Sequence, residues 1–453
     1  MKYIKNDHFE LEENLQKHEI KSHTKAISQK SILILMGENG IDFLKEKEDK
    51  IACIISTQEI LDKINLNIKK IPIKNPRKAW ANICFLNHPN LPKNIIAVTG
   101  TNGKTSITNF VSQILNNLEI PNILIGTLGI FENGKKTKAL KNTTPDASII
   151  HENVSNFAIK NRSESFCIIE ATSIGIDQER TAYLPPSMGI FNNFSLDHLD
   201  YHKNEETYLE NKLKLSQLSK NFLVHESIKN KIKSKNYKYY GKELKAIKYE
   251  EEKLIIELEL DSKKYKLKLN LIGQFQAENI LSAIIILKEY FNLKDIITAA
   301  EKIKAIPGRM EKIENCIVDF AHTSDALEKA IEESLKINKN LCVVVGCGGN
   351  RDKCKRPEFG GILNKASYAI ITNDNPRFED PMQIAKEIES GINQSTQYKI
   401  ILDRKTAIKE GYNWAKENNG LCLIAGRGAE EYQKIKDENI KFSDIEYLKS
   451  ILT

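Results

Sequence analysis

The sequence predicts an α/β protein of three domains, because apolar strands and helices alternate along it in two separate series. The 453 residues are ample for about three domains of roughly 150 residues each. Strands that alternate with helical stretches are typical of parallel sheets. The first series of apolar strands is expected at 122–126, 166–170, 188–191 and 221–225, and the second at 316–320, 341–346, 368–372 and 420–425.

Proline and glycine mark the expected domain boundaries. A proline-rich segment at 88–92 ends a region of short elements, and the turn Ile306–Arg309 separates the two strand series. Within the central region, charged and apolar residues alternate over 246–272, which predicts an antiparallel excursion. We expect a small N-terminal α/β domain, a central parallel-sheet domain and a C-terminal Rossmann-like α/β domain, at residues 1–92, 93–305 and 306–453.

Composition excludes several classes of protein. Hydrophobic residues make up 41% and charged residues 28%, which indicates a globular chain, and no apolar run is long enough for a membrane span. The first residues have no apolar signal region, so we expect a cytoplasmic protein. The net charge of +7 is small and spread out, so nucleic acid is not an expected partner, whereas anionic nucleotides are. The 8 cysteines form no CxxC pair and are expected to be buried free thiols rather than a zinc site.

A glycine-rich loop follows the first strand of the central domain. Residues Thr99–Thr105 read TGTNGKT, and a helix pattern covers 104–117. Backbone N–H groups of such a loop face an anion at the helix N-terminus, with Lys104 reaching the β- and γ-phosphates and the Thr105 hydroxyl binding Mg²⁺. The loop lacks the glycine that the strict pattern has five residues before Gly103, so it is a shortened P-loop. It predicts ATP binding but not the use of the ATP. A simple strand-to-helix turn is the alternative.

Polar residues follow two further strands of the central domain. Glu170 ends the apolar strand at 166–170, where ligands of parallel sheets gather, so it can hold Mg²⁺; a solvated glutamate is the alternative. The loop Asp197–His202 follows another strand, and His198 or His202 could ligate a second metal or could simply be structural.

Lys212 of the central domain is a further candidate residue, although nothing in its spacing sets it apart from other helix lysines. Lys212 lies on an expected helix at 205–219, four residues after Tyr208, so the two side chains share one helix face. A cation is an odd neighbour for a metal, and a solvated lysine is the simpler interpretation.

These motifs together resemble the Mur ligases, the ATP-dependent amino-acid-adding enzymes of peptidoglycan synthesis. Gly346–Asp352 and Asp374–Arg377 resemble the branch of that family that adds diaminopimelate. The resemblance implies a ligase that joins meso-diaminopimelate to UDP-N-acetylmuramoyl-L-alanyl-D-glutamate through an acyl phosphate, with release of ADP and phosphate. It rests on Thr99–Thr105, Glu170, Asp197–His202, Lys212, Pro307–Glu311 and Asp319–Leu327.

The resemblance also implies roles for single residues. The family lysine that matches Lys212 is carbamylated, which turns a cation into an anion that can help to position Mg²⁺. Two Mg²⁺ ions are expected, and His322 is a candidate for orienting phosphate or substrate. The expected metal ligands are Thr105, Glu170, His198 and carbamylated Lys212. The expected catalytic residues are Lys104, His198, Lys212 and His322.

Three binding sites are implied in the same way. The ATP site is expected to comprise Gly100, Thr101, Asn102, Gly103, Lys104, Thr105, Ser106, Asn279, Arg309 and Asp319. The UDP-muramoyl-dipeptide site is expected to comprise Ser22, Asn142, Thr143, Thr144, Thr172, Gln178 and Arg180. The diaminopimelate site is expected to comprise Arg351, Asp374, Asn375, Pro376, Arg377, Gly426 and Glu430. Arg377 and Arg351 suit this substrate physically, because a guanidinium grips a carboxylate bidentately and lysine lacks the second carboxylate of diaminopimelate.

The sequence departs from the family pattern at three positions and leaves other functions open. Ile174, Gln276 and Ala429 stand where the family usually has His, Asn and His. The same reaction with L-lysine, a ligase similar to folylpolyglutamate synthase, and a nucleotide-binding adaptor without amide chemistry are the alternatives. We expect a monomer whose domains close on the substrates about a hinge at Ile306–Gly308, because glycine tolerates large backbone changes.

Overall fold

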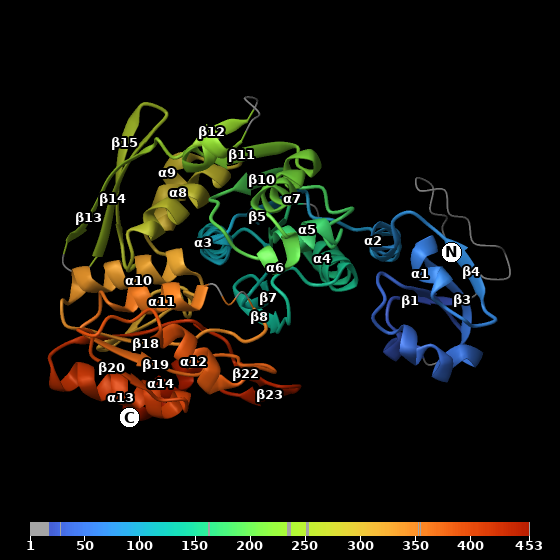
Figure 1. Cartoon of the computed structure of the whole chain (residues 1–453). Coiled ribbons are helices and arrows are strands. Elements are labelled where there is room, and N and C mark those ends of the chain that lie inside the picture. The colour runs from blue at the N-terminus through green and yellow to red at the C-terminus, as the bar shows by residue number, and fades with distance from the viewer. Residues whose placement is uncertain are drawn as a thin grey trace. The chain divides into compact units, whose positions relative to one another are not determined.

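The computed structural model describes residues 18–27, 29–161, 164–232, 237–250, 253–351, 353 and 355–452. By its internal contacts the chain groups into two units. The first comprises residues 1–97, 121–189 and 214–221, and the second comprises residues 98–120, 190–213 and 222–453. Helices and strands alternate throughout, as Figure 1 shows, and the predicted α/β class is confirmed.

The N-terminal region contains a parallel sheet with the order β1-β2-β3-β4. Its core strands are fully buried because Ile, Leu and Cys face both sides of the sheet. Helix α2 (Pro76–Asn87) follows, and the Asn75 side chain caps it by accepting a hydrogen bond from Lys78 N at 3.0 Å. The strands are β1 (Glu19–Lys21), β2 (Ser31–Ile34), β3 (Ile51–Ser56) and β4 (Lys69–Pro72), and helix α1 spans Gln58–Asp62.

The central region contains an eight-stranded sheet with the order β12-β11-β10-β5-β9-β6-β7-β8. The strands predicted at 122–126, 166–170, 188–191 and 221–225 are all present, and β6 pairs with β9 in parallel as expected. The strands are β5 (Asn94–Thr99), β6 (Asn122–Gly126), β7 (Gly129–Glu132), β8 (Lys135–Lys138), β9 (Phe166–Glu170), β10 (Met188–Phe191), β11 (Asn221–His225) and β12 (Lys238–Tyr240). The helices are α3 (Lys104–Asn117), α4 (Ala147–Asn161), α5 (Ser173–Asp177), α6 (Leu199–His202) and α7 (Glu205–Leu218).

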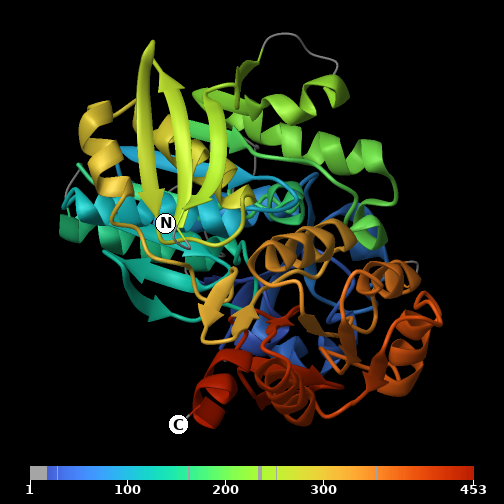
Figure 2. The ribbon, with the colours of Figure 1, turned by 90° about the vertical axis from the view of Figure 1, so that its left-hand side faces the viewer.

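The antiparallel excursion predicted at 246–272 is a three-stranded sheet. Strands β13 (Leu244–Glu250), β14 (Lys253–Leu260) and β15 (Lys263–Leu269) pair antiparallel in that order. Figure 2 shows the three strands side by side, and helices α8 (Phe275–Leu287) and α9 (Leu293–Ala300) contact β13 and β15. Leucine and isoleucine of the strands face these helices, while lysine and glutamate face outward.

The C-terminal region contains a six-stranded sheet with the order β16-β17-β21-β18-β19-β20, parallel except for β16. The strands expected near 316, 341, 368 and 420 are confirmed. They are β16 (Glu311–Ile313), β17 (Cys316–Val318), β18 (Leu341–Val345), β19 (Tyr368–Ile371), β20 (Tyr398–Ile400) and β21 (Leu421–Ile424). The helices are α10 (Ser324–Ile337), α11 (Lys355–Leu363), α12 (Pro381–Glu389), α13 (Arg404–Glu417) and α14 (Asp444–Leu452).

One element of this region was not predicted. A hairpin of β22 (Tyr432–Ile435) and β23 (Glu438–Lys441) follows the last parallel strand. It is polar and largely exposed, so no apolar alternation marked it in the sequence.

Each sheet lies within one of the three expected domain ranges, and the boundaries themselves stay a prediction. Within the described residues, no helix is both long and apolar enough to cross a membrane. The described cysteines are free thiols, and all of them except the half-buried Cys347 are buried.

Candidate functional site

The glycine-rich loop Thr99–Thr105, called the nucleotide loop from here on, joins β5 to α3 in a conformation that requires glycine. Gly103 has φ 83° immediately before helix α3 begins at Lys104. A Cβ at Gly103 would lie 2.5 Å from Asn279 Oδ1, so only glycine fits there. The Lys104 Nζ donates to the carbonyl oxygens of Gly100 and Thr101, both at 2.8 Å. The loop therefore curls around its own lysine at the start of a 14-residue helix, which is the geometry of a phosphate-binding site.

Two asparagines that follow strand β10 hold this loop. Asn193 Oδ1 accepts from Asn102 N at 2.9 Å, and its Nδ2 donates to Asn102 O at 3.0 Å. Asn192 is 3% exposed and its Nδ2 lies 3.5 Å from Asn279 Oδ1. The sequence placed both asparagines after a strand but gave them no role, because their partners lie about 90 residues away.

Lys212 is buried rather than solvated. Its side chain is 1% exposed, its Nζ donates to Gly100 O at 2.8 Å, and it lies 4.4 Å from the centre of the Tyr208 ring. The predicted pairing with Tyr208 on one helix face is confirmed. Burial, and secondly the Lys104 charge, lower the pKa of Lys212 well below its ordinary value. The lysine amine is thus directed toward its neutral, nucleophilic form.

The Asp197–His202 loop contains one half-buried histidine, His198, and one buried histidine, His202. His198 Nε2 lies 3.4 Å from Asp197 Oδ2, and Lys355 Nζ lies 2.7 Å from Asp197 Oδ1. Burial lowers the pKa of His198 to about 4, with Lys104 adding to the effect, so the imidazole is neutral near pH 7 and can act as a ligand. His202 is 2% exposed and pairs with Asn211 at 3.1 Å, which makes it a structural residue.

The remaining ATP-site residues lie around the same loop. Arg309 Nη2 donates to Thr105 Oγ1 at 3.0 Å, and the guanidinium stacks on Phe320 at 4.3 Å. Asp319 accepts from Met310 N at 2.7 Å and Ala321 N at 2.8 Å, and burial raises its pKa to about 6.

Two more residues predicted for the ATP site, Asn279 and Ser106, and the predicted catalytic residue His322 can be located. The departure at Gln276 is accommodated, because its Oε1 accepts from Asn279 Nδ2 at 2.9 Å. His322 is exposed, with Nδ1 2.9 Å from Phe320 O. Ser106 is buried in the first turn of α3.

Glu170 is likewise not solvated, since it is 1% exposed. Both carboxylate oxygens are bound by Thr127, through its N at 2.8 Å and its Oγ1 at 3.0 Å. Thr144 Oγ1 donates to Glu170 O at 2.7 Å and lies 3.0 Å from Thr172 Oγ1. Thr143 Oγ1 lies 3.1 Å from Thr127 Oγ1. Four threonine hydroxyls therefore surround one strand end, and Thr127 is the member that the sequence missed.

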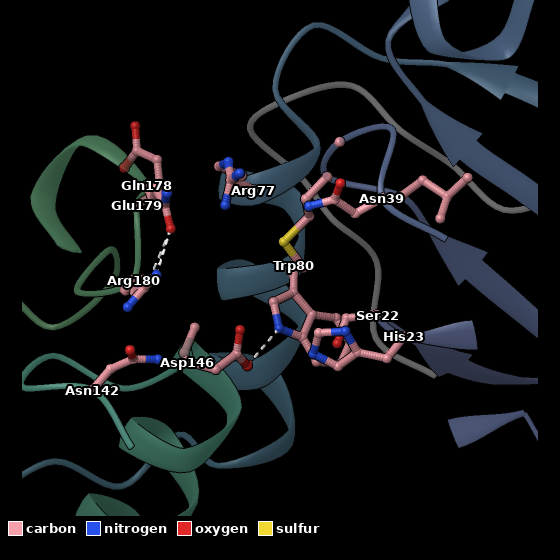
Figure 3. Close-up of a pocket in the computed structure, with 14 residues that line it drawn as sticks. Ser22, His23, Asn39, Arg77, Trp80, Asn142, Asp146, Gln178, Glu179 and Arg180 are labelled. Atoms are coloured by element: carbon pink, nitrogen blue, oxygen red, sulfur yellow. Dashed lines mark hydrogen bonds between the residues drawn. The ribbon is translucent and has the colours of Figure 1, made fainter. Parts of the chain in front are cut away.

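A pocket of about 300 Å³ lies in the first unit (Figure 3). Four predicted residues, Ser22, Asn142, Gln178 and Arg180, line it. The Arg180 guanidinium donates to Gln178 Oε1 at 2.6 Å and to Thr144 O at 2.7 Å. The lining residues that the sequence did not suggest include Arg77 and Trp80 of α2, together with His23, Asn39, Asp146 and Glu179. Trp80 Nε1 donates to Asp146 Oδ1 at 2.9 Å, as the dashed line in Figure 3 marks.

The loops after β19 and β21 bring two carboxylates together. Asp374 is buried and Glu430 is half-buried, and a Cβ at Gly426 would lie 2.7 Å from Asp374 Oδ2. Asn375 Nδ2 donates to Glu430 Oε2 at 2.9 Å. Burial, and then the Asp374 charge, raise the pKa of Glu430. This acidic pair suits an ammonium group.

Arg377 lies beside the acidic pair. Its Nη1 donates to Gly349 O at 2.8 Å, and its φ of 53° is left-handed. Burial, and then the Arg351 charge, lower the pKa of Arg377. The two guanidinium groups are therefore close enough to repel each other, and both could attract one anion. The predicted amino-acid residues Asp374, Asn375, Arg377, Gly426 and Glu430 are thus brought together in one region.

The unpredicted hairpin β22–β23 supports these residues. Lys434 N donates to Asn375 Oδ1 at 2.7 Å, and Gln433 Nε2 donates to Asp374 O at 2.5 Å. Arg377 N donates to Lys434 O at 3.2 Å. Behind the site, buried Arg404 pairs with Asp444 at 2.7 Å and donates to Ala425 O at 3.0 Å. The hairpin therefore holds the loop that carries Asp374, Asn375 and Arg377, through both backbone and side-chain donors.

A phosphate-binding loop at a strand end of the central sheet is followed by a Rossmann-like region with polar side chains at its strand ends, an arrangement that fits an ATP-dependent ligase. The profile of the "Mur ligase middle domain" matches residues 98–287, and that of the "Mur ligase, glutamate ligase domain" matches residues 308–428. The chain therefore belongs to the Mur ligase family, and it acts in peptidoglycan synthesis.

Two curated relatives and one solved structure illustrate the similarity. A UDP-N-acetylmuramoyl-L-alanyl-D-glutamate–2,6-diaminopimelate ligase of Rickettsia conorii is 35% identical over 472 residues, which cover 97% of each chain. UDP-N-acetylmuramyl-tripeptide synthetase 2 of Oceanobacillus iheyensis is 32% identical and covers 94% of this chain and 92% of its own. A solved 2,6-diaminopimelate ligase is 26% identical with a TM-score of 0.60, and the match covers 96% of this chain and 94% of that one.

The family uses ATP and Mg²⁺, and the nucleotide loop fits both. Across the described ranges, no three His, Cys, Asp or Glu side chains converge to hold a metal by themselves. Mg²⁺ commonly binds through one or two protein oxygens and the phosphates of a nucleotide. The Thr105 hydroxyl at the first turn of α3 is such an oxygen.

Proposed function

We propose that this ligase adds meso-diaminopimelate to UDP-N-acetylmuramoyl-L-alanyl-D-glutamate. The observation that supports the proposal is that acidic and basic side chains lie together in the C-terminal region, where Arg377 lies beside Asp374 and Glu430. The far end of diaminopimelate bears an ammonium and a carboxylate on one carbon. Asp374 and Glu430 suit the ammonium, and Arg377 with Arg351 suits the carboxylate. L-Lysine would leave both guanidinium groups without a substrate anion.

The pocket of the first unit suits the UDP-linked precursor. It contains cations for anionic groups, Arg77 and Arg180, and an aromatic surface at Trp80. His23 and Ser22 lie near Trp80 in the same pocket (Figure 3), so we assign this end to the nucleotide part of the precursor. Asn142, Gln178 and Arg180 then contact the muramoyl-dipeptide, with Thr143, Thr144 and Thr172 behind them.

The nucleotide loop activates the precursor. The terminal carboxylate of the precursor attacks the γ-phosphorus of ATP. ADP leaves, and the product is an acyl phosphate. Two anions meet in this step, so positioning and cationic charge carry most of the catalysis. Lys104 supplies charge at the phosphates, Arg309 binds a phosphate, and Asn279 and Asp319 bind adenine and ribose. Mg²⁺, when bound, neutralises the phosphate oxygens, and Thr105 is its proposed ligand in the loop.

The neutral amine of the incoming amino acid then attacks the carbonyl carbon of the acyl phosphate. Phosphate leaves, and the amine nitrogen loses a proton to water or phosphate. The tetrahedral oxyanion needs positively charged neighbours. We propose His322 as a group that orients the phosphate or the substrate. His198 and Glu170 are the further metal ligands that the family resemblance implies.

Lys212 is proposed to carry a carbamate. Its neutral amine would attack CO₂, forming an N–C bond and releasing one proton, and the product is an anion. Burial and the lowered pKa of Lys212 support this reaction, because only the unprotonated amine is nucleophilic. A carbamate beside Gly100 O would offset the charge of Lys104 and provide oxygens for Mg²⁺.

We propose a cytoplasmic, monomeric enzyme, for which the free buried thiols are supporting evidence. Release of inorganic phosphate from ATP tests the function. It is expected only when the muramoyl-dipeptide precursor and diaminopimelate are both present. Release with a folate and glutamate would favour the folylpolyglutamate-synthase-like alternative, and nucleotide binding with no release would favour the adaptor.

A further inference from the structure

Arg356 is a buried arginine in the first turn of α11 that the reaction itself does not use. Its side chain is 1% exposed. Its two terminal nitrogens donate to the two carboxylate oxygens of Glu379, at 3.0 and 3.1 Å. Nη1 also donates to Glu387 Oε2 at 2.5 Å. A buried arginine in a bidentate pair fixes the direction of its carboxylate partner.

Glu379 joins the two loops of the amino-acid site. Its Oε1 accepts from Asn350 N, in the loop that follows β18. Its own backbone N donates to Pro376 O at 3.0 Å, in the loop that follows β19. Asn350 returns the contact, because its Oδ1 accepts from Phe378 N at 3.1 Å. The carboxylate of Glu379 is therefore bound by Arg356 on one side and by the first loop on the other.

The same two loops present the guanidinium groups proposed to read the substrate. Arg351 follows Asn350 directly, and Arg377 follows Pro376. Gly349 N donates to Asn375 O at 2.9 Å, and a Cβ at Gly349 would overlap Pro376 O, so the backbones touch. The loops that carry Arg351 and Arg377 are therefore in direct backbone contact.

We propose that the Arg356–Glu379 pair is a positioning device that sets the distance between Arg351 and Arg377 for the far carboxylate of the amino acid. This inference rests on the proposed function, since it assumes that these two arginines bind the diamino acid. The hydrogen bond from Arg356 also holds the pKa of Glu379 near 2, so the pair stays charged over the working range of pH.

Glu387 offers a matched control. It contacts the same guanidinium from helix α12, where its other partner is Gln383 at 3.0 Å. Removing the charge of Glu387 weakens its ion pair with Arg356 but leaves the contact of Glu379 with Asn350 in place. A purely structural role for the cluster would make the Glu379 and Glu387 variants alike.

Steady-state kinetics of the full chain test the inference, with KM measured separately for diaminopimelate, ATP and the muramoyl-dipeptide. Glu379→Ala is expected to raise KM for diaminopimelate roughly 10- to 100-fold, because small misplacements of a binding group have effects of this size. KM for ATP and for the precursor should stay within about two-fold, and Glu387→Gln should leave all three KM values within about two-fold. If Glu379→Ala fails to fold, Glu379→Gln serves, since it keeps an acceptor for Asn350 N and should give a smaller rise in the same KM.

Two results would overturn the inference. One is an equal rise in all three KM values for the Glu379 variant, and the other is the same change in Glu387→Gln. Arg377→Ala, measured in parallel, separates this inference from the proposed function. If Arg377→Ala leaves KM for diaminopimelate unchanged, the substrate assignment fails. If Arg377→Ala raises that KM and the Glu379 variants do not, only the positioning role fails.

Discussion

Replacing Arg377 with alanine removes the guanidinium that the account assigns to the far carboxylate of diaminopimelate. The backbone at this position has φ 53°, a left-handed conformation that any side chain with a Cβ finds unfavourable. Alanine keeps the Cβ, so the backbone cost is unchanged and the variant isolates the guanidinium. The hydrogen bond from Arg377 Nη1 to Gly349 O is also lost.

The size of the effect follows from the surroundings. Leaving a buried charge without its partner costs about 2–5 kcal/mol. Arg351 remains close enough to influence the pKa of Arg377, so the carboxylate keeps one cationic neighbour in the variant. We therefore expect the lower part of this range, about 2–3 kcal/mol, or roughly 30- to 150-fold in kcat/KM.

The assay compares kcat/KM for diaminopimelate and for L-lysine in the wild-type enzyme and in Arg377→Ala. Lysine has no far carboxylate, so kcat/KM for lysine should change by less than about three-fold. An equal loss for both amino acids would refute the reasoning, because Arg377 would then support the fold or the shared end of the amino acid.

Three further predictions concern the nucleotide site. Lys212→Arg, which introduces a permanent cation that cannot form a stable carbamate, and Lys212→Ala should both lose nearly all turnover, and a small carboxylic acid should partly restore only the alanine variant; full activity in either would contradict the carbamate. Gly103→Ala should abolish ADP binding in calorimetry, because the new Cβ would lie 2.5 Å from Asn279 Oδ1, and unchanged affinity would show that the loop is not the phosphate site. The pKa of Asp319, raised to about 6 by burial, means that its ionised form is lost as the pH falls through 6. ADP affinity should weaken between about pH 7 and pH 5, and a matching pH dependence in Asp319→Asn would contradict the ribose role.

The regular elements could be predicted because each has a local cause. Runs such as Phe166–Glu170 and Leu341–Val345 are apolar throughout, which is the pattern of a strand buried on both faces. The helix at α3 follows a glycine that no other residue can replace. The hairpin β22–β23 has no such signal, since most of its side chains are exposed and its backbone contacts Asn375 and Arg377, which lie far away in the sequence.

Residues of the candidate site could be predicted only where they lie in a short sequence motif, such as Thr99–Thr105 or Asp374–Arg377. The spacing of Lys212 favoured a solvated side chain, and this interpretation was wrong, because the burial of Lys212 depends on a distant segment that includes Gly100. The alternative of a solvated Glu170 is also wrong, because Thr127 binds the buried carboxylate. The contacts of Asn193, Trp80 and Glu379 span long stretches of sequence, so no local pattern reveals them. The metal, carbamate and substrate roles of the site residues stay predictions.

The most direct test of the central claim is a competition in one tube. The enzyme is given ATP, Mg²⁺, the muramoyl-dipeptide precursor, and equal concentrations of meso-diaminopimelate and L-lysine, and the products are identified by mass spectrometry. The account predicts a tripeptide product that contains diaminopimelate almost exclusively, with one ADP and one phosphate formed per product. A product that contains mainly lysine would contradict the assignment of Asp374, Glu430 and Arg377 to the far end of diaminopimelate.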